Sequence, residues 1–252
     1  MSSQKYTTLL LDMDGVLAEV SQSYRAAIVK TCHTYGATAV NDEIVTEMKR
    51  RGNANDDWQL SHRLIQEYSA LPNKEEITLE QVTETFEQYY QGHGDTPGLC
   101  TLETLIPQKE TLLELHKRSK PGIGIVTGRP RSDCMKFLHE HGLDTLIAAT
   151  YCMEDGPSKP DPTPVLRVCA LLGVEPSRSV VLVGDTPDDI TAAVAAGCSG
   201  VGVTTPEAAA AEAALGKPHT EAILSQTMQQ NGADLILPPG FAELVDLFPE
   251  SE

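Results

Sequence analysis

The sequence predicts an α/β protein whose parallel sheet carries helices on both faces, with an all-helical segment inserted after the first strand. Residues 9–11 form an apolar run too short for a helix, and it ends at Asp12 and Asp14. Some ninety residues of purely helical spacing follow. From Pro107 onward, strand and helix patterns alternate, which is typical of a parallel sheet built from repeated βα units.

Composition narrows the class of protein. The 252 residues include 36 Asp and Glu against 19 Lys and Arg, a formal net charge of −17. Such a balance disfavours nucleic acid and anionic membrane surfaces as partners. It also means that an anionic substrate needs local positive groups or a bound cation.

Targeting and cysteine patterns favour a cytoplasmic location. The first eight residues are polar and lack the features of a signal peptide, and no apolar run approaches membrane-spanning length. The six cysteines are scattered without a Cys-x-x-Cys pair, so we expect reduced thiols rather than disulfides or a zinc site.

The inserted segment is predicted to be a separate helical cap domain over 19–104, and residues 1–18 and 105–252 are predicted to form the sheet domain. Thr78 and Gln81 have the spacing of a capping box, which places a helix start there. Gly and Pro are dense over 92–98, so this stretch is expected to be a loop. The other helices expected in this domain cover 21–36, 43–50 and 57–68.

The second half predicts the remaining strands and helices. Helices are expected to end at Gly142, Gly173 and Gly197, because glycine adopts the left-handed conformation that closes a helix. The expected strands cover 123–126, 145–150, 179–183, 201–203 and 234–237. One helix is expected to start at Pro107. The other expected helices cover 132–141, 163–172, 187–196, 207–215, 220–230 and 241–248.

Polar residues follow three further strands, as Asp12 and Asp14 follow the first. They are Thr127-Gly128-Arg129, Lys159 within Ser158-Lys159-Pro160, and Asp185 with Asp188 and Asp189. Each has an ordinary structural interpretation: a turn residue, a solvated lysine, or acids in the first turn of a helix capped by Thr186. A parallel sheet, however, brings these strand ends to one edge. Three aspartates, a hydroxyl and a lysine there favour a site for Mg²⁺ and a phosphoryl group.

Taken together, these motifs resemble those of haloacid dehalogenase (HAD) superfamily phosphatases with a helical cap. The resemblance implies a Rossmann-like sheet domain, with Asp12 as the nucleophile that forms an aspartyl-phosphate. It implies that Asp14 is the general acid and base, that Thr127 binds the phosphoryl oxygens, and that Lys159 neutralises charge. Mg²⁺ would be held by Asp12, the Asp14 carbonyl and Asp185, with Asp189 in support. Whether Asp188 or Asp189 is the supporting acid stays open.

The expected activity is Mg²⁺-dependent hydrolysis of a small phosphorylated metabolite. Dehalogenases of this type lack an acid at the position of Asp14, and no lysine of the cap is marked for phosphonate cleavage through an imine. A sugar phosphomutase remains the main alternative, and a non-catalytic binding module of the same fold is a weaker one.

Substrate recognition is assigned to six residues, and neither the substrate nor the oligomeric state is predicted. Four belong to the predicted cap, where cations, an amide and the only tryptophan offer contacts to a second anionic group or a ring. Burial of Trp58 in the cap core and solvation of the arginines stay open as the alternative. The six are Arg25, Arg51, Asn55, Trp58, Gly128 and Arg129.

Overall fold

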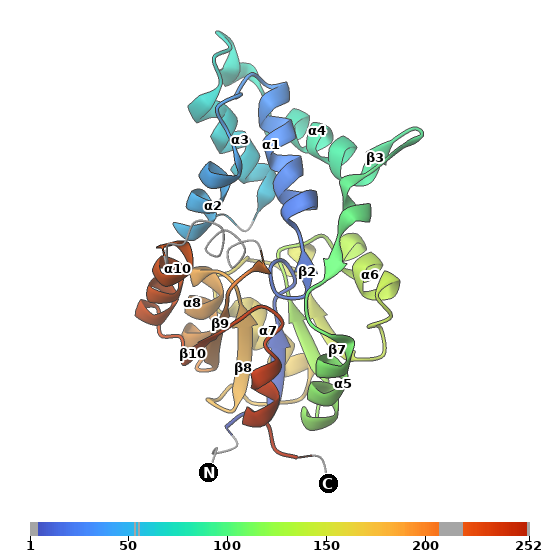
Figure 1. Cartoon of the computed structure of the whole chain (residues 1–252), viewed down its shortest axis with the longest axis vertical. Coiled ribbons are helices and arrows are strands. Elements are labelled where there is room, and N and C mark those ends of the chain that lie inside the picture. The colour runs from blue at the N-terminus through green and yellow to red at the C-terminus, as the bar shows by residue number, and fades with distance from the viewer. Residues whose placement is uncertain (1–4, 53, 55, 207–218, 251–252) are drawn as a thin grey trace. The chain divides into compact units, whose positions relative to one another are not determined.

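The computed structural model describes residues 5–52, 54, 56–206 and 219–250 (Figure 1). The chain divides into two compact units. The first, here called the sheet unit, combines Met1–Glu19 with Leu105–Glu252, and the second, the helical unit, is Val20–Thr104. From the sequence, these boundaries are expected between residues 18 and 19 and between residues 104 and 105.

The sheet unit is built on six parallel strands in the order β10-β9-β8-β1-β6-β7. The central strands β1 and β8 and their neighbour β6 are buried along their whole length, as expected for a sheet covered on both faces. This confirms the predicted fold class. The strands are β1 (Thr8–Leu11), β6 (Ile123–Val126), β7 (Ile147–Tyr151), β8 (Val180–Gly184), β9 (Ser199–Val203) and β10 (Leu235–Leu237).

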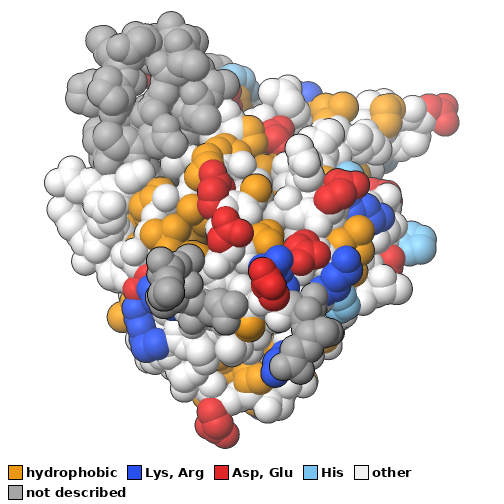
Figure 2. Space-filling model, turned by 60° about the horizontal axis from the view of Figure 1, so that its bottom comes forward, with side chains coloured by type: hydrophobic (Ala, Val, Ile, Leu, Met, Phe, Trp, Pro, Cys, Tyr) orange, Lys and Arg blue, Asp and Glu red, His pale blue; other side chains and the backbone are white. Residues whose placement is uncertain are grey.

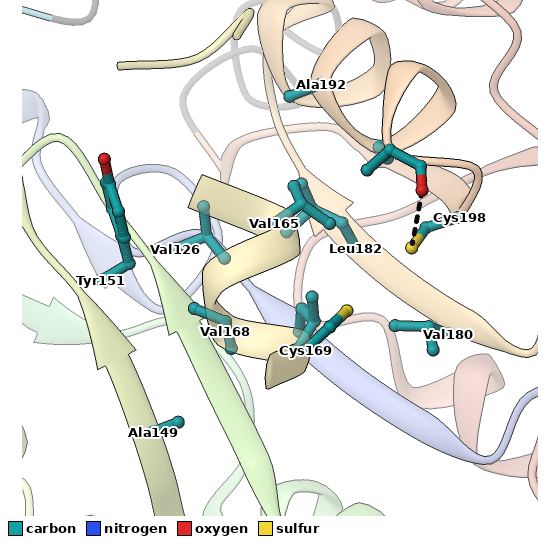
Figure 3. Close-up of a cluster of buried hydrophobic side chains, with 13 residues drawn as sticks. Val126, Ala149, Tyr151, Val165, Val168, Cys169, Val180, Leu182, Ala192 and Cys198 are labelled. Atoms are coloured by element: carbon teal, nitrogen blue, oxygen red, sulfur yellow. Dashed lines mark hydrogen bonds between the residues drawn. The ribbon is translucent and has the colours of Figure 1, made fainter. Parts of the chain in front are cut away.

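Helices cover both faces of this sheet. Helices α7 and α8 pack on β6, β7, β8 and β9 and enclose a buried apolar cluster that includes Leu10, Val168 and Leu182 (Figure 3). Burying one such side chain contributes about 1.5–3 kcal/mol. Helix α5 and the 3₁₀ turn η5 pack together on the other face (Figure 1). The helices are α5 (Lys109–Arg118), α6 (Arg131–Glu140), α7 (Thr163–Leu171), α8 (Pro187–Ala195) and α10 (His219–Gln230), with 3₁₀ turns η4 (Met153–Asp155) and η5 (Ala242–Leu247).

The helical unit packs around an aromatic core. The rings of Tyr24 and Tyr90 lie 4.1 Å apart between centroids, and Phe86 packs beside both. The capping box of Thr78 and Gln81 forms as the sequence predicts. The unit contains a π-helical turn, η1 (Ser21–Arg25), then α1 (Ala26–Thr34), α2 (Asp42–Arg50), α3 (Asp57–Tyr68), η2 (Lys74–Glu76), α4 (Leu79–Gln91) and η3 (Leu99–Leu102).

Several expected elements differ in the structure. The Gly-rich stretch is not a plain loop, because β3 (Gly92–His93) pairs with β4 (Thr96–Pro97) in a short hairpin. The helix expected from Pro107 begins at Lys109, since Gln108 is extended at the N-cap. The final helix is a 3₁₀ turn. Two short strands, β2 (Ala18–Glu19) and β5 (Thr104–Leu105), pair where the chain passes between units. The helix expected over 207–215 lies outside the described residues.

Surface and cysteine features agree with the composition. All six cysteines are buried and free of disulfide bonds. Among the described residues, no helix is long and apolar enough to cross a membrane. On the face that Figure 2 shows, the visible Lys and Arg side chains lie beside Asp and Glu side chains, not in one continuous basic patch.

Candidate active site

The predicted site residues of the sheet unit follow the ends of three adjacent strands. Leu11 of β1 pairs in register with Ile125 of β6 and Val183 of β8. Asp12 continues β1, and its backbone N–H donates to the Val183 carbonyl at 2.9 Å. Thr127 and Asp185 follow the other two strands directly, so the parallel register brings all three to one edge of the sheet.

Lys159 reaches this edge from the loop before α7. Its Nζ lies 2.9 Å from Oδ1 of Asp12 and 2.5 Å from Oδ1 of Asp189, and it donates to the Val126 carbonyl at 3.0 Å. The side chain is 3% exposed, so the interpretation as a solvated surface lysine is wrong. Burial alone lowers the pKa of Lys159, but the charges and hydrogen bonds of the two carboxylates outweigh it and raise the pKa, which keeps the ammonium charged.

Asp12 is a buried carboxylate with a raised pKa. Burial raises the pKa of Asp12 to about 7, with further upward contributions from Asp189 and Asp14, while Lys159 opposes the shift. One lysine therefore compensates the Asp12 charge only in part. A further cation beside Asp12 would favour the ionised form, which is the form that can act as a nucleophile.

Three buried acids form a group suited to a divalent cation. One carboxylate oxygen from each of Asp12, Asp185 and Asp189 lies within 4.8 Å of the other two. Buried carboxylates need paired charge, and Lys159 forms ion pairs with two members of this group, Asp12 and Asp189. Gly15 adds room for the acids: its φ is +73°, and a Cβ there would lie 2.3 Å from Oδ2 of Asp185. The oxygen-rich group therefore fits Mg²⁺, which prefers carboxylate and water ligands.

Asp189 has a second duty within this group. Its Oδ2 accepts hydrogen bonds from the backbone N–H of Thr186 at 3.0 Å and from Oγ1 of Thr186 at 2.6 Å, which forms a capping box at the start of α8. Its Oδ1 faces Lys159. Because both oxygens are engaged, Asp189 holds Lys159 and the first turn of α8, and Asp12 and Asp185 are better disposed to hold a metal. Asp188 is buried next to it.

The side chains of Asp14 and Arg129 form an ion pair that the sequence did not indicate. Nε of Arg129 donates to Oδ1 of Asp14 at 2.6 Å. Thr127 is linked to the same loop, because its Oγ1 accepts from the backbone N–H of Arg129 at 3.1 Å. Arg129 was expected to contact substrate, yet its side chain is 1% exposed while that of Asp14 is 28% exposed. Gly128, between the two motif residues, is partly buried.

The substrate-binding candidates of the helical unit have partners within that unit. Arg25 donates through Nη1 to Oγ1 of Thr46 at 3.1 Å, and Trp58 donates through Nε1 to Oε1 of Glu87 at 3.0 Å.

Arg51 pairs with Glu47 at 2.9 Å, one helical turn away, and its side chain is 67% exposed. Asn55 lies outside the described residues. The structure thus gathers the candidates of the sheet unit and gives those of the helical unit no common site of their own among the residues described.

A family model for haloacid dehalogenase-like hydrolases matches residues 9–203. A protein of Phytophthora nicotianae named imidazoleglycerol-phosphate dehydratase is 47% identical over 245 residues, which are 96% of this chain and 52% of that protein. A phosphoglycolate phosphatase of Haemophilus influenzae is 37% identical over 130 residues, or 51% of this chain and 55% of that enzyme. The chain therefore spans about half the length of these relatives.

Solved structures share the fold across both units. A predicted phosphoglycolate phosphatase from Haemophilus somnus superposes with a TM-score of 0.70 at 22% identity, over 96% of this chain and 97% of that one. A β-phosphoglucomutase from Clostridium difficile gives a TM-score of 0.65 at 16% identity, over 96% of each chain. The family match extends over more than two thirds of the sequence and includes every motif gathered at the sheet edge, and the chain therefore belongs to the haloacid dehalogenase-like hydrolases.

Proposed function

We propose that this protein is a Mg²⁺-dependent phosphatase that hydrolyses a small phosphorylated metabolite through an aspartyl-phosphate on Asp12. One observation carries the proposal. The carboxylate of Asp12 is buried at the sheet edge, lies 2.9 Å from the ammonium of Lys159, and belongs to a group with Asp185 and Asp189. A nucleophilic carboxylate beside compensating positive charge is what attack on a phosphate dianion requires.

The roles of the neighbouring side chains follow from their charge and placement. Lys159 offsets the repulsion between Asp12 and the phosphoryl group, and the hydroxyl of Thr127 is a hydrogen-bond donor for the phosphoryl oxygens. Asp14, the more exposed acid, gives a proton to the leaving oxygen as Asp12 bonds to phosphorus. It then takes a proton from the water that releases phosphate.

The metal would be held by Asp12, Asp185 and the backbone carbonyl of Asp14, with Asp189 supporting through Lys159. When bound, Mg²⁺ supplies positive charge that neutralises the phosphoryl oxygens and orients them for in-line attack. The helical unit is proposed as the source of specificity for the leaving group, through the region of Arg51 and Asn55.

The direct test measures free phosphate released from a panel of phosphate monoesters by the purified chain with Mg²⁺. The panel includes 2-phosphoglycolate and imidazoleglycerol phosphate, because the names of the relatives point to them, together with sugar phosphates and p-nitrophenyl phosphate. We expect one mole of phosphate for each mole of ester consumed. Conversion of one sugar phosphate isomer to another without phosphate release would identify a mutase instead. Absence of turnover on the whole panel would favour a binding module.

The metal assignment is tested by Asp185→Ala, with Asp161→Asn as the matched control. Asp161 lies two residues from Lys159 but outside the acidic group, and its Oδ1 accepts a hydrogen bond from the backbone N–H of Thr163, the first residue of α7. Asp185→Ala should weaken Mg²⁺ binding in a calorimetric titration at least about tenfold, because Mg²⁺ has few protein ligands to lose. The control should bind Mg²⁺ as the wild type does. Wild-type turnover that survives exhaustive chelation would show that no metal is needed.

A further inference from the structure

Arg129 is the buried partner of Asp14, and we infer that it is a positioning residue, one that fixes the Asp14 carboxylate for proton exchange with the leaving group. The inference rests on the proposed phosphatase function and assigns to Arg129 a role different from the substrate contact expected from its sequence. It stands on three features of the structure: how the guanidinium is held, how the backbone of Asp14 is held, and which of the two side chains a ligand can reach.

The Arg129 guanidinium is fixed by its surroundings. Its Cζ lies 5.4 Å from the centroid of the Phe137 ring, a buried ring on α6 that offers its face to a cation. The backbone of Arg129 is held at both sides: its N–H donates to Oγ1 of Thr127, and its carbonyl accepts from the N–H of Met153 at 2.9 Å. A guanidinium held in this way is a rigid donor, because the side chain has little freedom left to move.

The backbone of Asp14 is fixed as well, so that only its side-chain torsions remain to be set. The turn after β1 closes through hydrogen bonds from Gly15 N–H to the Ala18 carbonyl at 2.9 Å and from Leu17 N–H to the Met13 carbonyl at 2.8 Å. An aspartate at a partly exposed turn would otherwise rotate among several staggered positions. The 2.6 Å bond from Nε of Arg129 to Oδ1 selects one of them.

Exposure separates the two side chains as targets for a ligand. Asp14 is 28% exposed, and Arg129 is 1% exposed behind it. A phosphate ester arriving at the sheet edge therefore meets the carboxylate, not the guanidinium. Since Oδ1 is engaged by Arg129 and a carboxylate has two oxygens, Oδ2 is the oxygen that we assign to proton exchange.

The chemistry served by this arrangement is a balanced pair of proton transfers. In the first step an oxygen of Asp12 bonds to phosphorus, the bond from phosphorus to the ester oxygen breaks, and that oxygen takes the proton of Asp14. In the second step water bonds to phosphorus, its proton returns to Asp14, and the bond between Asp12 and phosphorus breaks to release phosphate. Both transfers need Asp14 within hydrogen-bond reach, about 2.6–3.2 Å, of an oxygen on the ligand.

The test compares two esters in variants of Arg129. A p-nitrophenolate ion leaves without a proton, whereas the alkoxide of an alkyl phosphate such as glycerol phosphate needs one. Arg129→Met should lower kcat for the alkyl ester by about 10- to 100-fold, since general acid catalysis contributes about 10²–10⁴-fold in all. Its kcat for p-nitrophenyl phosphate should fall less than about threefold, and KM should change little for either ester. Arg129→Lys, which keeps a cation, should show a smaller loss with the same dependence on the leaving group.

A double-mutant comparison and a matched control complete the design. If Arg129 acts through Asp14, adding Arg129→Met to Asp14→Asn should lower kcat for the alkyl ester no further than Asp14→Asn does alone. The effects of coupled residues are non-additive. Arg131→Met is the control, because it removes the same charge two residues away. The Arg131 side chain donates hydrogen bonds to Thr150 and Asp155 instead. The control should match the wild type on both esters.

Two results would overturn the inference while leaving the phosphatase intact. One is an equal loss on both esters with a raised KM, which would make Arg129 a substrate contact. The other is an additive loss in the Asp14→Asn background. A wild-type protein that releases phosphate from no ester of the panel would overturn the proposed function itself, and the positioning role with it. Circular dichroism of each variant, with Arg129→Lys as the less disruptive change, separates these outcomes from failure to fold.

Discussion

The sheet unit and the helical unit bury charge in different ways. In the described part of the helical unit, the buried charged side chains are Arg25 and Asp57. Arg25 donates to Thr46, and Asp57 forms an ion pair with Lys49, within the same unit. In the described part of the sheet unit, every buried charged side chain lies at or next to the edge where β1, β6 and β8 end. They are Asp12, Arg129, Asp133, Lys159, Asp185, Asp188 and Asp189.

We interpret this difference as one between charges that serve the fold and charges that serve the proposed site. The ion pair of Lys49 and Asp57 can be explained by folding alone, because each charge compensates the other. In the sheet unit, five buried aspartates lie near two buried cations, and like charges in a low-dielectric site oppose folding. The bound cation proposed above would offset part of the negative charge of these acids. Removing a buried charge should therefore cost activity in one unit and stability in the other.

The largest effect is expected for Asp12→Asn. A neutral amide cannot attack phosphorus, so turnover should fall to less than about a thousandth of the wild-type rate. Without metal, the thermal midpoint should stay the same or rise, because one of several clustered buried carboxylates has been neutralised. Phosphate release and calorimetry measure the two effects, with mass spectrometry to exclude deamidated protein. Retention of more than a few per cent of activity contradicts the nucleophile assignment.

The converse is expected for Lys49→Met in the helical unit. Nζ of Lys49 lies 2.7 Å from Oδ1 of Asp57, and the Lys49 and Asp57 side chains are largely buried. Removing the ammonium should lower the free energy of unfolding by about 1–3 kcal/mol, since a buried carboxylate loses its cation. Hydrolysis of p-nitrophenyl phosphate at a temperature where the variant is folded should be unchanged. Loss of activity in the folded variant would remove the contrast between the units.

A smaller, pH-dependent effect is expected for Asp234→Asn in the sheet unit, away from the strand ends that carry the site. Burial would raise the pKa of Asp234, but hydrogen bonds from Lys5 and Ser199 and the charges of Lys5 and Arg178 outweigh it, so the pKa is lowered. A group with a lowered pKa stabilises the fold above its unfolded pKa, and this contribution is lost as the pH falls through the folded value.

At pH 7 the Asp234→Asn variant should be less stable by about 1 kcal/mol, a modest figure because Lys5 and Arg178 are partly exposed. The deficit should shrink as the pH falls below about 4, where the unfolded carboxyl is protonated. Urea unfolding at several pH values measures it. A deficit that stays constant from pH 7 to pH 3 would mean that packing, not charge, is responsible.

The smallest effect on stability is expected for Arg51→Ala. The pair of Arg51 and Glu47 is exposed, so its loss should change the free energy of unfolding by less than about 0.5 kcal/mol. With the natural substrate, however, kcat/KM should fall markedly if this region recognises the leaving group, as it should for Asn55→Ala. Hydrolysis of p-nitrophenyl phosphate should change far less. Equal losses on both substrates would place recognition elsewhere in the chain.

The sheet edge was predictable because strand position alone determines which residues meet there. Asp12, Thr127 and Asp185 each follow an apolar run directly, and the parallel register of the strands brings them to the same edge. The capping box of Thr78 and Gln81 was predictable for the same reason: it depends on residues three apart.

The partners of individual side chains could not be predicted from the sequence pattern. The ion pair of Asp14 and Arg129 joins residues 115 positions apart, and its formation depends on loop conformations that no periodicity encodes. Trp58 was chosen as a ligand contact for its chemistry, yet its indole N–H bonds to Glu87 on a neighbouring helix. In the helical unit, residue type suggested recognition, but the local partners of each side chain could be found only from the fold.

Gly184 leaves space beside β8 that the Asp189 side chain occupies. A Cβ at this position would lie 2.1 Å from Cβ of Asp189, so the acid that holds Lys159 occupies space that only a residue without a side chain leaves open. A relative that retains every acid and the lysine but has alanine in place of Gly184 would still match each of these motif positions. Its acids would nevertheless be pushed apart. Loss of function in this family can therefore arise by steric exclusion, with all the reactive groups still present in the sequence.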